Sequence, residues 1–136
     1  MVFKPMAIEK SQKAYNFTKI WIGKYGEKLA EKHLRSLGYK VVERNAKMKD
    51  GEIDLIVKKG SEIILVEVKT LRNSTWMRPV ESVDWKKRKR LSKIAAQYLW
   101  MRKISRCQVS FMVVGVDLSK KGDDRFEVIP NAFWAE

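Results

Sequence analysis

The chain has 136 residues, which is enough for one domain with a hydrophobic core and too few for two. Lys and Arg number 29 against 16 Asp and Glu, so the net charge of +13 predicts a polyanionic partner, with nucleic acid ahead of an anionic membrane surface. One cysteine and one histidine exclude an intrachain disulfide, Cys/His zinc sites and histidine-paired catalysis, and leave carboxylate–metal chemistry as the main enzymatic option.

The N-terminal segment carries no pattern typical of export or membrane insertion. Met1–Lys13 is mixed and charged and lacks the apolar core of a signal peptide, and no apolar stretch of the chain is long enough to span a bilayer. We therefore expect a reduced, cytoplasmic location. Cys107 is expected to be a small core residue, and His33 a core histidine.

The first helix is predicted after an irregular start. Residues 1–22 are expected to form an N-terminal arm or extension, with at most a short helix over Ala14–Ile20, and residues 23–136 a single domain. From Trp21 to Leu37 an apolar stripe recurs at helical spacing, and a glycine follows as a stop signal. The stripe consists of Ile22, Gly26, Leu29, Ala30, His33, Leu34 and Leu37.

The middle of the chain predicts three strands. Lys40–Arg44 is expected to be a short strand, and Asn45–Asp50 a polar loop. Two apolar runs then predict a hairpin of residues 52–58 and 62–70. A polar segment with proline predicts a loop over residues 71–82.

The last part predicts a second helix and two strands. The helix is expected from Val83 to Lys103, with Leu91, Ile94, Ala95, Tyr98 and Met101 as its apolar stripe. Val109–Val116 is expected to be a buried central strand, followed by a charged turn at Lys120–Asp124 and a strand at Arg125–Ile129. The order α-β-β-β-α-β-β predicts an α/β domain in which a mixed sheet has a helix on each side.

The predicted hairpin brings carboxylates together. Gly60-Ser61 suits a two-residue turn, which would pair Lys59 with Glu62, Ile56 with Leu65, Asp54 with Glu67, and Glu52 with Lys69. Carboxylates directly opposite one another repel, at a cost of about 4 kcal/mol for an effective dielectric near 20. A divalent cation between them would remove that repulsion, and Mg²⁺ prefers carboxylate oxygens.

Asp54, Glu67 and Lys69 therefore form the first candidate site, because residues two apart on a strand share a face. The continuous apolar runs around the carboxylates favour strands covered on both sides. The alternative is the wet face of a hairpin, with Lys69 paired to Glu52.

Glu27 is a candidate outer carboxylate. It lies near the edge of the apolar face of the first helix, from where it could reach the strand site. Glu31, one turn further on, is the competing candidate, and a solvated position is the alternative for Glu27.

The second helix is strongly basic, since no acid occurs from Trp85 to Val116. Solvated helix faces usually mix charges of both signs, so this run predicts contact with phosphates. The candidates for nucleic-acid binding are Lys86, Lys87, Lys89, Arg90, Lys93 and the loop residue Arg72. Trp76 and Trp100 could stack on unpaired bases, with core or rim aromatics as the alternative.

An acid in one strand followed by Glu-x-Lys in the next, here Asp54 and Glu67-Val68-Lys69, resembles the PD-(D/E)XK nucleases. A longer set of motifs over about residues 23–133 resembles the YraN-like family of uncharacterised proteins. These motifs are Gly23-x-x-Gly26-Glu27-x-x-Ala30, Gly38-Tyr39, Arg44-Asn45, Gly51-Glu52-Ile53-Asp54-Leu55-Ile56, Val66-Glu67-Val68-Lys69-Thr70, Lys87, Leu91, Ala95, Tyr98-Leu99 and Asn131-Ala132-Phe133.

The resemblance implies a restriction-endonuclease-like mixed sheet and an endonuclease similar in its core to archaeal Holliday-junction resolvases. It implies catalytic roles for Glu27, Asp54, Glu67 and Lys69, with Mg²⁺ or Mn²⁺ held by Asp54, Glu67 and the main-chain carbonyl of Val68. The chain departs from the pattern in two places. No proline precedes Asp54, and the Lys-Thr-Arg of the family is interrupted before Arg72.

The sequence therefore predicts a metal-dependent endonuclease acting on structured DNA, with DNA favoured over RNA and no membrane partner. A homodimer would suit the cutting of two strands. One alternative is a nucleic-acid-binding module on the same fold without turnover. Another is an assembly protein that uses its basic face for RNA or a protein partner.

Overall fold

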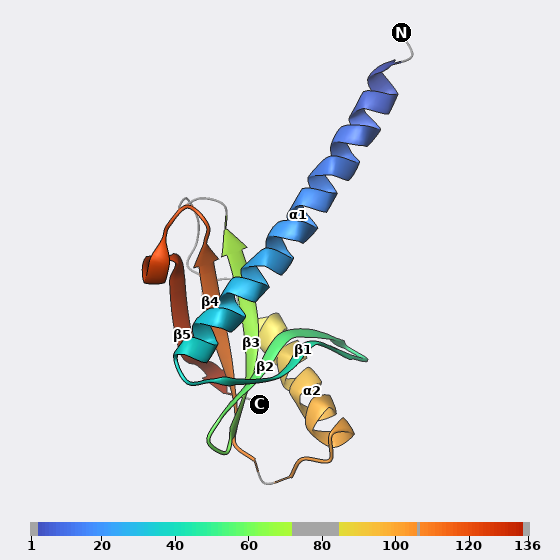
Figure 1. Cartoon of the computed structure of the whole chain (residues 1–136). Helices are drawn as coiled ribbons and strands as arrows, with labels where there is room; N and C mark the ends of the chain where they lie inside the picture. The colour runs from blue at the N-terminus through green and yellow to red at the C-terminus, as the bar shows by residue number, and fades with distance from the viewer. Residues whose placement is uncertain (1–2, 72–84, 106, 135–136) are drawn as a thin grey trace.

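The computed structural model describes residues 3–71, 85–105 and 107–134. Its main elements follow the predicted order α-β-β-β-α-β-β (Figure 1). They are α1 (Phe3–Ser36), β1 (Lys40–Met48), β2 (Gly51–Lys59), β3 (Glu62–Leu71), α2 (Trp85–Met101), β4 (Val109–Asp117), the short 3-10 helix η2 (Gly122–Arg125) and β5 (Phe126–Trp134). The predicted mixed α/β architecture is confirmed.

The five strands form one sheet in the order β1-β2-β3-β4-β5. β3 and β4 are parallel and the other neighbours are antiparallel, so the sheet is mixed. Parallel neighbours need a long crossover, and α2 lies in the segment between β3 and β4. β4 is an inner strand, buried from Ser110 to Asp117, although the central position belongs to β3.

Each face of the sheet is covered by one helix (Figure 1). Ala30 and Leu34 of α1 pack against strand residues such as Val57 and Val114. On the other face α2 packs against Ile53, Ile56 and Leu65, among others. The α2 residues in this second core are Leu91, Ile94, Ala95 and Tyr98, which is the predicted stripe without Met101.

α1 begins at Phe3 rather than at Trp21, so the expected boundary between residues 22 and 23 falls inside one continuous helix. The N-terminal half of α1 extends beyond the sheet (Figure 1). That half has no sheet surface to cover, which explains why its sequence lacks the apolar periodicity that predicts a helix. At the other end, Leu37 was predicted as part of the apolar stripe, but it follows the last helical residue and is 45% exposed.

Two strands extend several residues beyond their predicted ends. β1 continues through the expected loop because Ala46, Lys47 and Met48 pair with β2. β5 continues past Ile129 to Trp134 along β4. Most of the loop predicted over residues 71–82, with Arg72 and Trp76, lies outside the described residues. In the described part of the chain, neither long helix has a stretch apolar enough to cross a bilayer.

Candidate functional site

The β2–β3 hairpin has the predicted turn but a shorter ladder. Gly60 has a φ of 61°, and the pairing runs from Lys59 with Glu62 to Leu55 with Val66. The predicted pairs of Asp54 with Glu67 and of Glu52 with Lys69 are wrong as ladder pairs. Instead, Oδ2 of Asp54 accepts a hydrogen bond of 2.8 Å from the backbone amide of Val68. The carboxylate thus replaces a backbone acceptor at the point where β2 leaves β3 (Figure 1).

A cleft of about 490 Å³ opens between α1 and this part of the hairpin. Carboxylates from three elements line it: Glu27 of α1, Asp54 of β2 and Glu67 of β3. Gly26 lets α1 come this close, because a Cβ there would lie 2.7 Å from Cγ2 of Thr70 on β3. The residue after this contact, Glu27, is therefore held at the cleft.

The carboxyl groups of Glu27 and Asp54 are shifted towards their protonated forms. Burial, followed by the charges of Asp54 and Glu52, raises the pKa of Glu27 from 4.5 to about 7. Burial also raises the pKa of Asp54 from 3.8 to about 6, and the charge of Glu67 adds to this, while the hydrogen bond from Val68 opposes it. A cation in the cleft would stabilise the charged forms of these two carboxyl groups.

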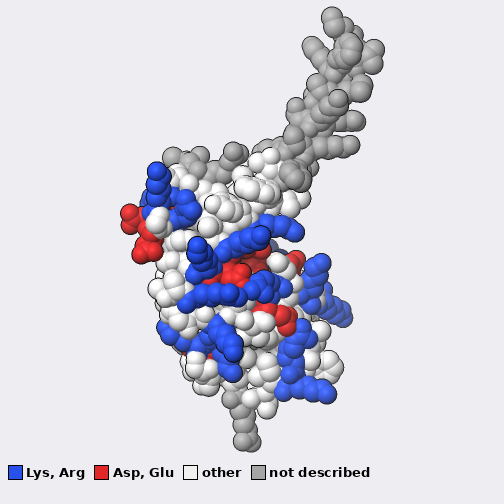
Figure 2. All heavy atoms as spheres, viewed as in Figure 1, with Lys and Arg blue, Asp and Glu red and all other residues white. Residues whose placement is uncertain are grey.

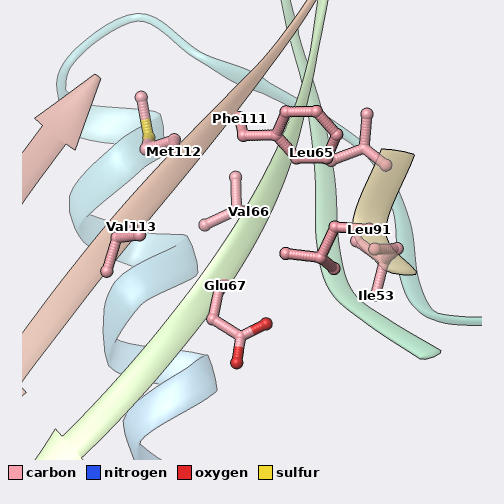
Figure 3. Close-up of a pocket in the computed structure, with 8 residues that line it drawn as sticks. All are labelled: Ile53, Leu65, Val66, Glu67, Leu91, Phe111, Met112 and Val113. Carbon is pink, nitrogen blue, oxygen red and sulfur yellow. The ribbon is translucent and has the colours of Figure 1, made fainter. Parts of the chain in front are cut away.

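Glu67 also belongs to the rim of the core. Figure 3 shows it beyond Leu65 on β3, with its oxygens pointing away from the apolar side chains. Its Oε1 accepts a hydrogen bond of 2.6 Å from Nζ of Lys87 on α2 and lies 3.5 Å from Nζ of Lys69. Lys69 therefore pairs with Glu67 rather than with Glu52. Burial and the neighbouring Lys87 lower the pKa of Lys69.

Lys87 was predicted to bind nucleic acid, but the structure places it against Glu67. Its position could have been inferred, since it lies four residues before the buried Leu91 and therefore on the inner side of α2. Four other predicted residues, Lys86, Lys89, Arg90 and Lys93, line a separate hollow together with Asp50. Arg72 lies outside the described residues.

Glu27 and its competitor Glu31 have different partners in the structure. Glu31 forms ion pairs with Arg35 at 3.2 Å and with Arg44. Glu27 instead faces Asp54 across the cleft and takes a side-chain hydrogen bond from Asn45. Figure 2 shows acidic side chains on this side of the molecule surrounded by Lys and Arg.

The donor chemistry of the cleft fits a hard divalent cation, because every candidate ligand is an oxygen. Asp54 and Glu67 would hold Mg²⁺ or Mn²⁺ with the carbonyl of Val68, and Glu27 would complete the site directly or through water. Among the described residues, no group of three or more His, Cys, Asp or Glu is close enough together to form a metal site. Binding would require the carboxylates to move closer together and Glu67 to exchange its contact with Lys87 for the cation.

Of the other residues named from the sequence, His33 and Cys107 pack against the fold and Trp100 is exposed. The His33 ring stacks on Phe126 with 4.1 Å between ring centres. Cys107 is half-buried, packs against the core under α2, and its thiol lies 3.2 Å from the carbonyl oxygen of Ser61. Trp100 is 83% exposed on α2, so it is not a core residue.

The raised pKa of Glu27 has a consequence for stability. A carboxyl with a higher pKa in the folded state than in the unfolded state binds protons more readily when folded. In EDTA, the melting temperature is therefore expected to fall as the pH rises from about 4.5 to about 7. Glu27→Gln should flatten this dependence in thermal unfolding, while Glu31→Gln should preserve it. An unchanged slope in Glu27→Gln would contradict the assignment.

Comparison with known proteins gives consistent matches over most of the chain. The model of a family described as Uncharacterised protein family UPF0102 matches residues 26–130. A UPF0102 protein of Dictyoglomus turgidum is 43% identical over 113 residues, covering 82% of this chain and 96% of the relative. A UPF0102 protein of Clostridioides difficile is 41% identical over 111 residues, covering 82% and 95%. These matches confirm the family resemblance predicted from the motifs.

Proposed function

Given that the chain belongs to the uncharacterised protein family UPF0102, we propose that it is a metal-dependent endonuclease that hydrolyses phosphodiester bonds in structured DNA. The observation that carries this proposal is the cleft lined by Glu27, Asp54 and Glu67, in which two carboxyl groups have raised pKa values. A fold alone has no need to gather three acids in one cleft.

Each residue of the site has a role in this proposal. When bound, Mg²⁺ or Mn²⁺ would supply a water of lowered pKa and offset the negative charge of the scissile phosphate. Asp54 and Glu67 would hold the cation, and Glu27 would accept a hydrogen bond from the water. Lys69 would position that water or offset the negative charge that develops on the phosphoryl oxygens, and its lowered pKa suits a group that exchanges protons.

A nucleic-acid-binding module without turnover is the second candidate. The contact of 2.6 Å between Lys87 and Glu67 favours it, because it occupies an oxygen that a metal ligand would need. In this case Glu67 would be held by Lys69 and Lys87, and Asp54 by the amide of Val68. Binding of DNA would then survive the loss of Asp54 and Glu67.

The test is a cleavage assay. The full chain would be incubated with end-labelled linear, flapped and four-way-junction DNA in Mg²⁺, Mn²⁺ or EDTA. The endonuclease is supported by a product that requires a divalent cation and is more abundant from branched substrates than from linear DNA. Salt-sensitive binding with no product in either metal would instead favour the binding module. The proposal also includes a cytoplasmic location. It is compatible with a homodimer, which sedimentation would detect.

The lysines of α2 are proposed to hold the DNA backbone. Each neutralised phosphate contributes about 0.9 to the slope of log affinity against log salt. Replacing Lys86, Lys89 and Lys93 by Gln should therefore reduce the slope for duplex DNA by up to about three units. Lys121→Gln, beside η2, is the matched control for a single lost charge. Equal slopes in the triple variant and the wild type would exclude this surface.

A further inference from the structure

The outer face of α1 carries two aromatic side chains in contact with each other. Trp21 is 57% exposed and Tyr25 is 38% exposed, and their rings stack with 5.3 Å between centres and 17° between planes. The neighbouring Ile20 is 61% exposed. Large apolar groups gathered on a surface mark an interaction site more often than single ones do.

Lysines continue the same line along the helix. Trp21, Tyr25, Lys28 and Lys32 are separated by four, three and four residues, which places them in one row on an α-helix. All four are exposed, and the row lies opposite the buried side of α1. Figure 2 shows uncharged side chains on this part of α1 beside Lys and Arg. Aromatic rings followed by cations suit an unpaired strand, which offers base faces and phosphates.

The helix that carries the row also lines the carboxylate cleft. A second hollow is lined by Lys19, Ile20 and Lys24 of α1 and reaches Glu27 and Asp54. These α1 residues flank Trp21 and Tyr25 in the sequence. A strand lying along the row would lie on the outer side of the same helix that lines this hollow.

Other occupants fit this surface less well. A second copy of the same face would bring lysine against lysine. A bilayer would require apolar groups over a longer row than two rings and one isoleucine. A local pair of rings four residues apart would stabilise the helix slightly, but this does not explain their exposed faces or the cations beside them.

We propose that Trp21 and Tyr25 form a stacking platform for unpaired bases of a DNA strand, with Lys24, Lys28 and Lys32 holding its phosphates. Because the two rings already touch, a base would stack on the free face of either ring rather than between them. Both rings precede residue 26, where the match to the family model begins. The inference deepens the proposed function by naming an unpaired strand as the substrate class.

The test is DNA binding in EDTA, so that it does not depend on cleavage. Fluorescence anisotropy would compare an oligothymidine with a fully paired hairpin of equal charge. The Trp21→Ala/Tyr25→Ala variant is expected to lose about tenfold or more in affinity for the oligothymidine and less than about twofold for the hairpin. Trp21→Phe/Tyr25→Phe, which retains two ring faces, should recover most of the loss. Val42→Ala, on β1, is the control for removal of an exposed apolar side chain that the proposal does not use.

Equal losses for both DNAs, or no loss, would overturn the platform. A change of oligomeric state in the alanine variant would also overturn it, because it identifies a second copy of the chain as the occupant. Binding to phosphatidylserine vesicles that depends on the two rings would overturn it too, because it identifies a bilayer as the occupant. Circular dichroism and thermal unfolding would verify that the variants fold. Selective loss of oligothymidine binding without cleavage in any metal would retain the platform and reject the endonuclease. Metal-dependent cleavage at the wild-type rate in the Trp21→Ala/Tyr25→Ala variant would retain the endonuclease and reject the platform.

Discussion

Asp54→Asn is expected to abolish metal-dependent cleavage while leaving the fold intact. The amide oxygen can still accept the hydrogen bond from Val68, but the charge that would hold the cation is removed. The rate should fall by more than about a hundredfold, because even groups that merely support metal ligands are worth about 10–100-fold. The measurement is the initial rate on the best branched substrate in Mg²⁺ and Mn²⁺, together with a melting curve.

Two further variants separate chemistry from folding. Asp54→Ala should lose activity and also about 1–3 kcal/mol of stability, because it leaves the amide of Val68 without its acceptor. Glu31→Gln removes a carboxylate that pairs with Arg35 and Arg44, so it should retain cleavage. Cleavage that persists in Asp54→Asn would place the chemistry elsewhere.

The part of the hairpin that the sequence predicts correctly is the part set by its turn. A two-residue turn at Gly60 fixes the pairing of the next residues, and the pairing follows it as far as Leu55 and Val66. Beyond that point, a side chain competes with the backbone for the amide of Val68. Alternation of polar and apolar residues carries no information about such competition, so the pairing of Asp54 with Glu67 was predicted and is absent.

The α1 side of the cleft was less predictable for a different reason. The edge of an apolar stripe favoured Glu27 but left Glu31 as a competing candidate, and the ion pair of Glu31 with Arg44, which comes from β1, is what sets it apart. Long-range ion pairs of this kind follow from tertiary packing rather than from local spacing. For Lys87 the local spacing was sufficient. It lies four residues before the buried Leu91, which places it on the inner side of α2, where it contacts Glu67.

The close approach of α1 to the sheet should have a large effect on stability. Gly26→Ala would place a Cβ 2.7 Å from Cγ2 and 2.8 Å from Cβ of Thr70, closer than packed atoms tolerate. Overpacking of this kind costs about 1–3 kcal/mol, and it should exceed the gain of up to about 1 kcal/mol from the better helix propensity of alanine. The melting temperature should therefore fall.

Gly23→Ala is the matched control for this substitution, on the same helix and one turn earlier. A Cβ at Gly23 has no neighbour within 4 Å, so this variant should be as stable as the wild type or more stable by up to about 1 kcal/mol. Adding Thr70→Ala to Gly26→Ala should restore part of the loss, because it removes the Oγ1 and Cγ2 atoms of Thr70. Since the same contact holds Glu27 at the cleft, the rise in its pKa should also diminish in Gly26→Ala, which the pH dependence of unfolding would reveal. Equal melting temperatures for the two alanine variants would show that α1 does not depend on Gly26 to reach β3.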